Sequence, residues 1–260
     1  MSPNVKVEPY YFVGVLKKAA EIVEAIAERG EISVAELVSY LGQDRNAVNR
    51  IVLTLQDLGY VERLDNKKYR LTLKMFQLGS RSVSSGSVYR LINKHMKVLV
   101  DEFGETVCLG QRHGTEVVNV DMLSGHRPIL YTAHIGASGP LQATAMGKCI
   151  LAAMNDEELH TAMATLSFKP HTPKSITSRE KLSEEIQKVR RDGYSTDDEE
   201  WMTGVRCVGI AVYSPSGQCD QAISISGPAI TFVGKRLETI SQRMLEVRNS
   251  LIEAMNINLK

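Results

Sequence analysis

The feature that most constrains the fold of this chain is a series of three short segments with helical periodicity, each ended by a glycine, within the first 60 residues. Apolar residues in the range 12–30 recur at steps of three and four, the spacing of a helix with one buried face. The pattern returns before Gly42 and again before Gly59, and glycine suits the C-terminal cap of a helix. We therefore expect three short helices packed on one another.

Capping residues mark where the second and third of these helices begin. Ser33 and Glu36 have the spacing of a capping box. Asp44 precedes the third segment and is suited to accept a hydrogen bond from its first turn. One apolar stripe runs along that third helix and consists of Val48, Ile51, Leu55 and Leu58.

A β-hairpin and then a change in composition follow the three helices. Residues 60–64 and 69–73 alternate like short strands around a polar turn, which completes the order of a winged helix-turn-helix. Residues 79–87 are rich in serine and glycine and mark a linker. Because 260 residues favour two domains over one, we predict a helix-turn-helix domain over 10–75, a linker, including a linker helix, over 76–88, and a second domain over 89–258.

The second domain is predicted to be α+β with a mostly antiparallel sheet flanked by helices. Helices are expected at 88–103, 144–154, 155–166 and 233–255, and strands at 106–110, 116–123, 129–134, 205–213 and 221–226. A second capping box, Thr177 with Glu180, is expected to begin a helix that ends at Gly193.

Composition excludes several classes of protein. The net charge of +1 gives no global field for nucleic acid or membrane, so such a function requires a local patch. Four cysteines without a C-x-x-C pair favour reduced thiols in a cytoplasmic protein and predict neither a metal site nor a cofactor. The N-terminal apolar run has five residues, which is too short for a signal peptide, and no stretch is apolar enough for a membrane span.

The outward face of the third helix is predicted to bind double-stranded DNA. Once the buried stripe is set aside, Arg45, Asn46, Asn49 and Arg50 share that face, and arginine and asparagine are the side chains that pair with guanine and adenine edges. The hairpin carries five basic residues against the acids Glu62 and Asp65, namely Arg63, Lys67, Lys68, Arg70 and Lys74. The alternative is a solvated charged surface, which charge runs usually form.

These segments resemble the IclR family of bacterial transcriptional regulators, over nearly the whole chain. The N-terminal part of the resemblance rests on residues 44–50, 55–61 (LQDLGYV) and 69–72 (YRLT). The C-terminal part is more specific and rests on 140–148 (PLQATAMGK), 197–200 (DDEE), 204–208 (GVRCV) and 224–228 (SISGP). Where many members carry Ser-Thr and then an aromatic residue or histidine in the recognition helix, this chain has Asn46, Ala47 and Asn49, so its operator sequence cannot be transferred from relatives.

The resemblance implies a GAF-like domain that binds a small effector, such as an organic acid, a sugar acid or an aromatic compound. The positions that match effector contacts in relatives are Tyr131, Gly139, Ala145, Met146, Asp197, Val205 and Cys207. Small residues at a helix start leave backbone N–H groups free for an anion, whereas Met146 narrows the cavity. A solvated acidic loop is the alternative for residues 197–200. Relatives form dimers and dimers of dimers, which implies a homodimer that pairs through the first helix and the linker helix.

The sequence favours a metabolite-responsive regulator that is not an enzyme. Cys207 could serve as a nucleophile only with a base beside it, and the six histidines form no recognisable partner motif. Two alternatives stay open, namely a ligand-binding or redox GAF-type module with a helical appendage that does not bind DNA, and a winged helix that binds RNA or protein. The effector, the operator and the choice between repressor and activator are left open by the sequence.

Overall fold

The structure is a computed structural model that describes residues 13–83, 87–127 and 133–257. The chain divides into two compact units, Met1–Ser85 and Gly86–Lys260, and each is described by itself. The predicted linker, 76–88, spans this division. The first three residues of the predicted N-terminal domain, 10–12, lie outside the described residues.

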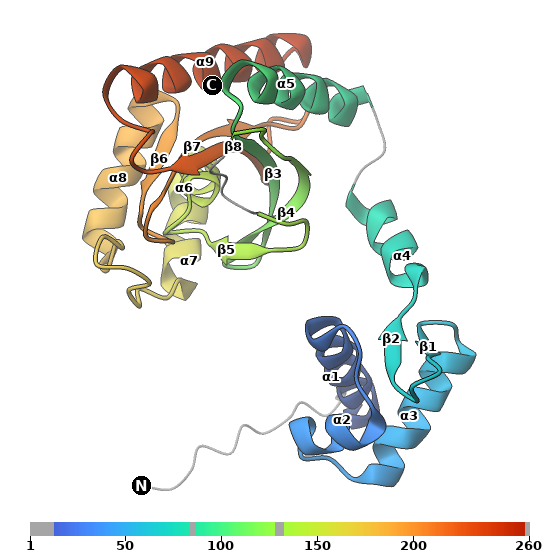
Figure 1. Ribbon diagram of the computed structural model, residues 1–260. Helices are drawn as coiled ribbons and strands as arrows, with labels where there is room; N and C mark the ends of the chain where they lie inside the picture. The colour runs from blue at the N-terminus through green and yellow to red at the C-terminus, as the bar shows by residue number, and fades with distance from the viewer. Residues whose placement is uncertain (1–12, 84–86, 128–132, 258–260) are drawn as a thin grey trace, which may run out of the picture. The chain divides into compact units, whose positions relative to one another are not determined.

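The first unit has the predicted helix-turn-helix with a wing (Figure 1). Its elements are α1 (Gly14–Arg29), α2 (Val34–Leu41), α3 (Arg45–Asp57), β1 (Val61–Arg63), β2 (Tyr69–Leu71) and α4 (Leu73–Val83). Both predicted caps are present, because Ser33 and Glu36 form a capping box and the Asp44 side chain accepts a hydrogen bond from the Ala47 N–H. An antiparallel bridge from Ile32 to Tyr69 ties the chain before α2 to the wing. The three helices enclose one core around Ile22, Leu37 and Val52.

One prediction for the end of this unit was wrong. The second strand ends at Leu71 rather than at 73, because Thr72 turns the chain into α4: its hydroxyl donates to the Gly59 carbonyl over 2.6 Å and accepts from the Lys74 N–H at 3.2 Å. The serine- and glycine-rich stretch continues this helix as far as Val83. A helix there is compatible with the predicted linker, which included a linker helix.

The second unit is built on one six-stranded sheet (Figure 1). Its strands are β3 (Thr106–His113), β4 (Glu116–Leu123), β5 (Ser138–Pro140), β6 (Ser195–Asp198), β7 (Val205–Val212) and β8 (Gln221–Pro228). Their order is β5-β4-β3-β8-β7-β6, and every pairing is antiparallel. The helices are α5 (Ser87–Phe103), α6 (Ala145–Ala153), α7 (Asp156–Thr165), α8 (Arg179–Asp192) and α9 (Gly234–Ala254).

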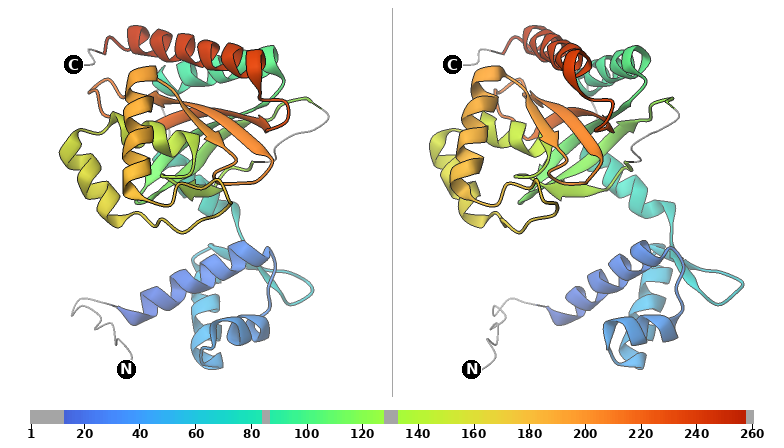
Figure 2. Two further views of the ribbon diagram at one scale, coloured as in Figure 1. Left: turned by 90° about the vertical axis from the view of Figure 1, so that its left-hand side faces the viewer. Right: turned by 60° about the vertical axis from the view of Figure 1, so that its left-hand side comes forward.

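Helices cover both faces of this sheet, so the unit has two cores. Helices α5 and α9 lie side by side over one face, where Met96 and Met244 pack against strand residues such as Ile223. Helices α6, α7 and α8 cover the other face, with Ile150 and Ile186 in the second core (Figure 2). The predicted α+β class with a sheet flanked by helices is confirmed.

Three details of the second unit were predicted differently. The expected strand over 129–134 lies mostly outside the described residues, and Ala133 and His134 are not in a strand. The short strands β5 and β6 were missed, since three and four residues carry little periodicity. The expected capping box of Thr177 with Glu180 is wrong, because Ser178 is the N-cap of α8 and accepts from the Lys181 N–H.

Candidate functional sites

One face of α3 is buried and the opposite face carries the predicted contact residues. Val48, Ile51 and Val52 lie in the core of the first unit. Arg45, Asn46, Asn49 and Arg50 are all exposed, as is Leu53. The cap at Asp44 fixes the first turn, which is the part of a recognition helix that usually meets base edges.

A groove joins this face of α3 to the wing. Its lining brings together five of the seven residues predicted to contact DNA, namely Arg45, Asn46, Asn49, Arg63 and Lys67. The two others lie outside it. Arg50 is exposed elsewhere on α3, and Lys68 faces Glu36 of α2, with 3.7 Å between the ammonium nitrogen and a carboxylate oxygen.

The basic excess of the wing is smaller than the sequence indicates, because ion pairs occupy part of it. The Arg70 guanidinium lies 2.7 Å from a Glu62 carboxylate oxygen. The Lys74 ammonium donates to the Leu58 carbonyl over 2.6 Å and sits over the Tyr60 ring. Within the described part of the chain, Arg63 and Lys67 are the wing cations whose side chains make neither an ion pair nor a hydrogen bond, and both line the groove.

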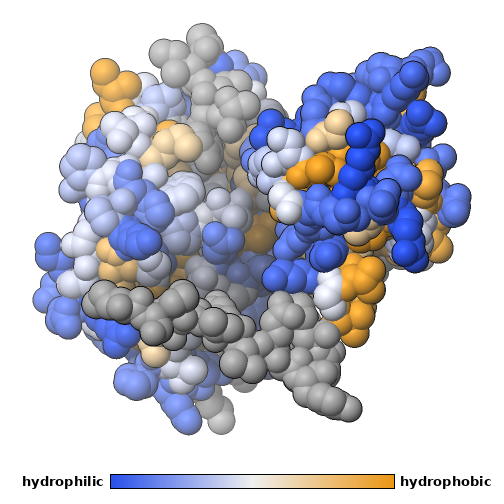
Figure 3. All heavy atoms as spheres, turned by 90° about the horizontal axis from the view of Figure 1, so that it is seen from below, coloured by the Kyte–Doolittle hydropathy of each residue, from blue (hydrophilic) through white to orange (hydrophobic). Residues whose placement is uncertain are grey.

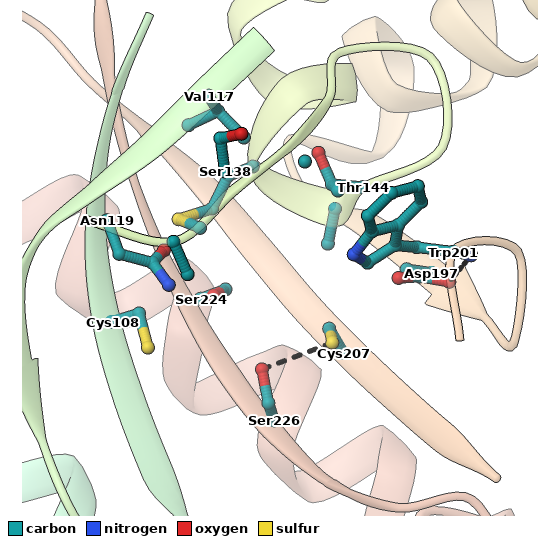
Figure 4. Close-up of a pocket in the computed structure, with 14 residues that line it drawn as sticks. Cys108, Val117, Asn119, Ser138, Thr144, Asp197, Trp201, Cys207, Ser224 and Ser226 are labelled. Carbon is teal, nitrogen blue, oxygen red and sulfur yellow. Dashed lines mark hydrogen bonds between the residues drawn. The ribbon is translucent and has the colours of Figure 1, made fainter. Parts of the chain in front are cut away.

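A second hollow lies inside the second unit, between the sheet and the start of α6 (Figure 4). We call it the cavity and define it by its lining: Cys108, Val117, Asn119, Ala137, Ser138, Gly139, Thr144, Ala145, Met146, Asp197, Trp201, Cys207, Ser224 and Ser226. Its volume of about 60 Å³ is room for roughly four to six waters at about 10–15 Å³ each. In this state the cavity therefore suits a ligand of only a few non-hydrogen atoms.

The N-terminus of α6 opens onto the cavity. Thr144 caps the helix by accepting from the Gly147 N–H at 3.1 Å, while Ala145 and Met146 line the hollow. Glycine allows the close approach of this helix to the sheet, because a Cβ at Gly209 would come within 2.9 Å of the Ala145 carbonyl carbon. The first N–H groups of a helix carry partial positive charge, so this end of the cavity favours an anionic group.

Asp197 is almost completely buried at the cavity wall, with 3% of its surface exposed. One carboxylate oxygen accepts from the backbone N–H of Glu200 at 2.7 Å and from that of Trp201 at 3.4 Å. Burial, and then the nearby Glu200 carboxylate, raise the pKa of Asp197 to about 7. The side chain is therefore poised between an acceptor and a proton donor near neutral pH.

Behind Asp197 lies a buried ion pair that the sequence did not reveal. Lys148 of α6 is fully buried, and its ammonium nitrogen lies 2.5 Å from a Glu200 carboxylate oxygen and 3.5 Å from one of Glu185. Burial raises the pKa of Glu200, while Lys148 opposes that shift. The only sequence signal was a lysine within the apolar run of α6. The pair ties α6 to the turn between β6 and β7, which carries Trp201 and follows Asp197 in the chain.

Cys207 lies opposite Asp197 in the pairing of β6 with β7 and lines the cavity. The Ser226 hydroxyl donates to its sulfur over 3.1 Å (Figure 4). Burial, and then the Asp197 carboxylate, raise the pKa of the Cys207 thiol well above its ordinary value. A nucleophilic cysteine needs the opposite shift, so this environment does not activate the thiol.

The remaining predicted effector residues divide three ways. Gly139 lines the cavity close to Trp201, since a Cβ there would come within 3.4 Å of the indole nitrogen. Tyr131 lies outside the described residues. Val205 is not part of the lining, because it stands at the first residue of β7 and pairs with Pro228, beyond the end of the hollow.

Sequence reasoning also missed several lining residues. Figure 4 places Asn119, Ser224 and Cys108 across the space from Asp197 and Trp201. These three residues come from strands that mix polar and apolar side chains, so none of them stands out in the sequence. Trp201 was also missed, although it is the single tryptophan of the chain.

Three further features bear on chemistry. Among the residues the structure describes, no three histidine, cysteine, aspartate or glutamate side chains are grouped so that they could hold a metal ion. None of the described helices is both long and apolar enough to cross a membrane. All four cysteines are free thiols.

Both units match models of known protein domains. Residues 15–65 match the IclR helix-turn-helix domain, and residues 80–251 match the C-terminal domain of the bacterial transcriptional regulator IclR. The HTH-type transcriptional regulator KdgR of Escherichia coli is 32% identical over 222 residues, which is 85% of this chain and 84% of KdgR. The transcriptional repressor IclR of the same species is 27% identical over 82% of this chain and 79% of its own length.

Solved structures agree with these sequence matches. The crystal structure of Thermotoga maritima IclR has a TM-score of 0.78 at 29% identity and covers 94% of this chain and 99% of its own. An IclR homologue from Microbacterium hydrocarbonoxydans, solved in complex with 4-hydroxybenzoate, shares the fold with a TM-score of 0.76 at 19% identity, over 92% of this chain and 99% of its own. This chain therefore belongs to the IclR family of DNA-binding transcriptional regulators, with an N-terminal helix-turn-helix domain and a C-terminal effector-binding domain.

Proposed function

We propose that the groove on the first unit binds operator DNA, and that a small organic molecule in the cavity of the second unit changes the affinity for that operator. The observation that carries the proposal is the groove itself. It combines Asn46 and Asn49, which can read adenine edges, with the unpaired cations Arg63 and Lys67. Asparagine side chains beside free cations fit the combination of base readout and phosphate contact that operator binding requires.

The proposed roles follow the position of each side chain. Arg45, Asn46 and Asn49 meet base edges in the major groove, and Arg50, farther along the exposed face of α3, meets bases or phosphate. Arg63 and Lys67 contact backbone phosphates. Lys68 contributes to the same phosphate contacts only if it leaves Glu36.

For the cavity we propose an effector that carries a carboxylate. A small organic acid fits the present volume of about 60 Å³, and a sugar acid or an aromatic acid requires the cavity to widen on binding. The start of α6 at Ala145 and Met146 offers backbone N–H groups to an anion. Asp197, with a pKa of about 7, is partly protonated near neutral pH and in that form can donate a hydrogen bond to the same carboxylate. The 4-hydroxybenzoate complex of the Microbacterium relative supports an acid of this kind. Gly139, Cys207 and Tyr131 complete the proposed contacts.

We further propose that the protein acts as a homodimer and assembles into dimers of dimers. One recognition helix reads few base pairs, so specificity calls for two half-sites about 34–36 Å apart. The exposed apolar residues Leu16 of α1 and Leu73 and Phe76 of α4 are suited to face a second copy, at 67%, 78% and 69% exposure. The face drawn in Figure 3 is mostly hydrophilic, with hydrophobic side chains in separate groups. Analytical ultracentrifugation showing only monomer at working concentration would overturn the proposal.

The proposal includes a cytoplasmic site of action and no catalysis. Free cysteines suit a reducing compartment. The raised pKa of the Cys207 thiol opposes its use as a nucleophile.

A genomic footprint on the native chromosome tests the proposed function. We expect discrete protected sites that contain two half-sites about 10 base pairs apart between centres, or a multiple of that spacing. Purified protein should bind such fragments more weakly as salt rises, because cations of the groove displace counterions from phosphates. An absence of discrete sites, with no salt-dependent binding to duplex DNA, would favour a ligand-binding module without DNA function.

A further inference from the structure

Strand β4 contains an irregularity at Val120, which lies between Asn119 and Asp121. In the pairing of β3 with β4, Gly110 pairs with Asn119 but Leu109 pairs with Asp121. Val120 is therefore an extra residue opposite no partner, which is the pattern of a β-bulge.

The bulge reverses the direction of one side chain. Paired residues of neighbouring strands share a face of the sheet. Asn119 lines the cavity, and the next residues on that face would be reached in steps of two. Because Val120 is inserted, Asp121 instead shares the face of Leu109, which belongs to the core beneath α5 and α9. Two residues of one strand thus reach opposite faces of the sheet.

On the cavity face, Asn119 holds the chain that leads into β5. Its backbone N–H donates to the Ala137 carbonyl over 2.9 Å, and its carbonyl accepts from the Gly136 N–H at 2.8 Å. Its side-chain amide donates to the His134 carbonyl over 3.4 Å. A ligand that moves Asn119 would therefore also move the segment 134–139, of which Ala137, Ser138 and Gly139 line the cavity.

On the opposite face, Asp121 holds the start of α5. One carboxylate oxygen accepts from the Tyr89 hydroxyl at 2.6 Å and from the Asn93 amide at 3.0 Å, and the other accepts from the Met122 N–H at 2.8 Å. Tyr89 and Asn93 are one helical turn apart. Burial, and then Asp121, raise the pKa of Tyr89 to about 12, so its hydroxyl remains a donor at neutral pH.

We propose that Asp121, Tyr89 and Asn93 are positioning residues that transmit the state of the cavity, through the bulge at Val120, to α5. Helix α5 is the first described element after residues 84–86, where the chain passes from the first unit to the second. The inference rests on the proposed function in one respect, namely that the cavity is the effector site. It gives the cavity a physical route to the segment that leads to the DNA-binding unit.

Hydrogen exchange of the full chain, without ligand or DNA, tests this connection. Tyr89→Phe removes one hydrogen bond to Asp121, and we expect it to speed exchange of the Asn119 and Gly136 amides about fivefold. In the reverse direction, Asn119→Ser should speed exchange of the amides of residues 91–94 in α5. Amides of β7 and β8 around Ile210 and Ile223 should keep their rates.

Tyr194→Phe is the matched control. Tyr194 packs against the same core as Tyr89, but its hydroxyl makes no hydrogen bond within the described residues. It should leave Asn119 and Gly136 unchanged. The proposal is overturned if Tyr89→Phe leaves both amides unchanged, or if it accelerates Ile210 and Ile223 equally, which would indicate general destabilisation. Since neither DNA nor effector is used, failure here is distinct from failure of the proposed regulatory function.

Discussion

The residues of the α3 groove that are proposed to contact DNA are exposed, whereas several polar side chains of the cavity already have partners within the protein. Arg63 and Lys67 line the groove without an ion pair in the described part of the chain. Asp197 accepts two backbone N–H groups, and Ser226 donates to Cys207. The groove cations are not neutralised by acids of the protein before DNA binds. The affinity of the groove for a polyanion should therefore come from charge and depend on salt.

The cavity follows a different physical rule. Its groups are held in place and shielded from water, so charge there is costly and protonation states shift. The comparison teaches that substitutions in the groove should alter binding without altering stability. Substitutions around the cavity should alter stability and pH dependence as well as ligand binding.

The largest effect is expected when the ion pair behind the cavity is broken. Lys148→Met leaves Glu200 and Glu185 without their buried cation and should cost about 3–5 kcal/mol of unfolding free energy. Lys174→Met is the control, since Lys174 is 47% exposed in its pairs with Asp198 and Glu199, and should cost less than about 1 kcal/mol. Urea unfolding measures both, and equal losses would contradict the contrast.

Asp197 should make stability depend on pH. Its folded pKa of about 7 lies above the ordinary value of 3.8, so the native state binds the proton more tightly than the unfolded chain. Its contribution to stability is full below about pH 4 and is lost as the pH rises through 7. Wild type should therefore lose stability relative to Asp197→Asn between pH 5 and pH 8.

The neighbouring carboxyl of Asp198 provides the control, because its pKa is shifted in the opposite direction from that of Asp197. Burial raises the pKa of Asp198, but Arg206 and Lys174 together outweigh burial and lower it. Its contribution is present above its unfolded pKa and is lost as the pH falls, so wild type and Asp198→Asn should keep a constant difference from pH 5 to pH 8. A constant difference for Asp197→Asn as well would show that Asp197 is ionised throughout.

In the groove, base readout should depend on Asn49. Asn49→Ala should weaken operator binding by about 1–3 kcal/mol, because an asparagine pairs with adenine through two hydrogen bonds. Fluorescence anisotropy with the footprinted fragment measures the loss, and an unrelated duplex serves as the control. An equal loss on both duplexes would assign Asn49 to phosphate contact, and unchanged affinity would remove it from the interface.

The smallest expected effect is a difference in the salt dependence of DNA binding between substitutions of two wing cations, Lys67 and Arg70. Lys67→Ala should weaken all duplexes alike and reduce the salt dependence by about one ion. Arg70→Ala should change the salt dependence less, because Glu62 already neutralises Arg70. If the two variants behave alike, pairing within the wing does not decide which cations reach the phosphates.

The first unit could be predicted from local sequence rules to within a few residues. Ser33, Asp44 and the glycine stops act through contacts with near neighbours, which a linear sequence displays. The helix at 79–83 was less distinct in the sequence, because its composition is typical of loops and the Thr72 hydroxyl at the start of α4 also bonds the distant Gly59 carbonyl.

The cavity was less predictable because its walls come from distant segments. Family motifs pointed to Asp197, Cys207 and the start of α6, which do line it. Asn119 reaches the cavity through the pairing of β4 with β3, and the partners of Lys148 lie 37 and 52 residues away. Side chains brought together by sheet register leave no periodic signal in one sequence.

The central claim is that the groove binds DNA and the cavity governs that binding. The most direct test is operator affinity of wild type and Asp197→Ala, each with and without a panel of organic, sugar and aromatic acids. We predict equal affinity without additives, because Asp197 lies in the other unit. We also predict that an acid shifts the wild-type affinity and has an altered effect on the variant. An identical response of both proteins would place the effector site elsewhere and contradict the account.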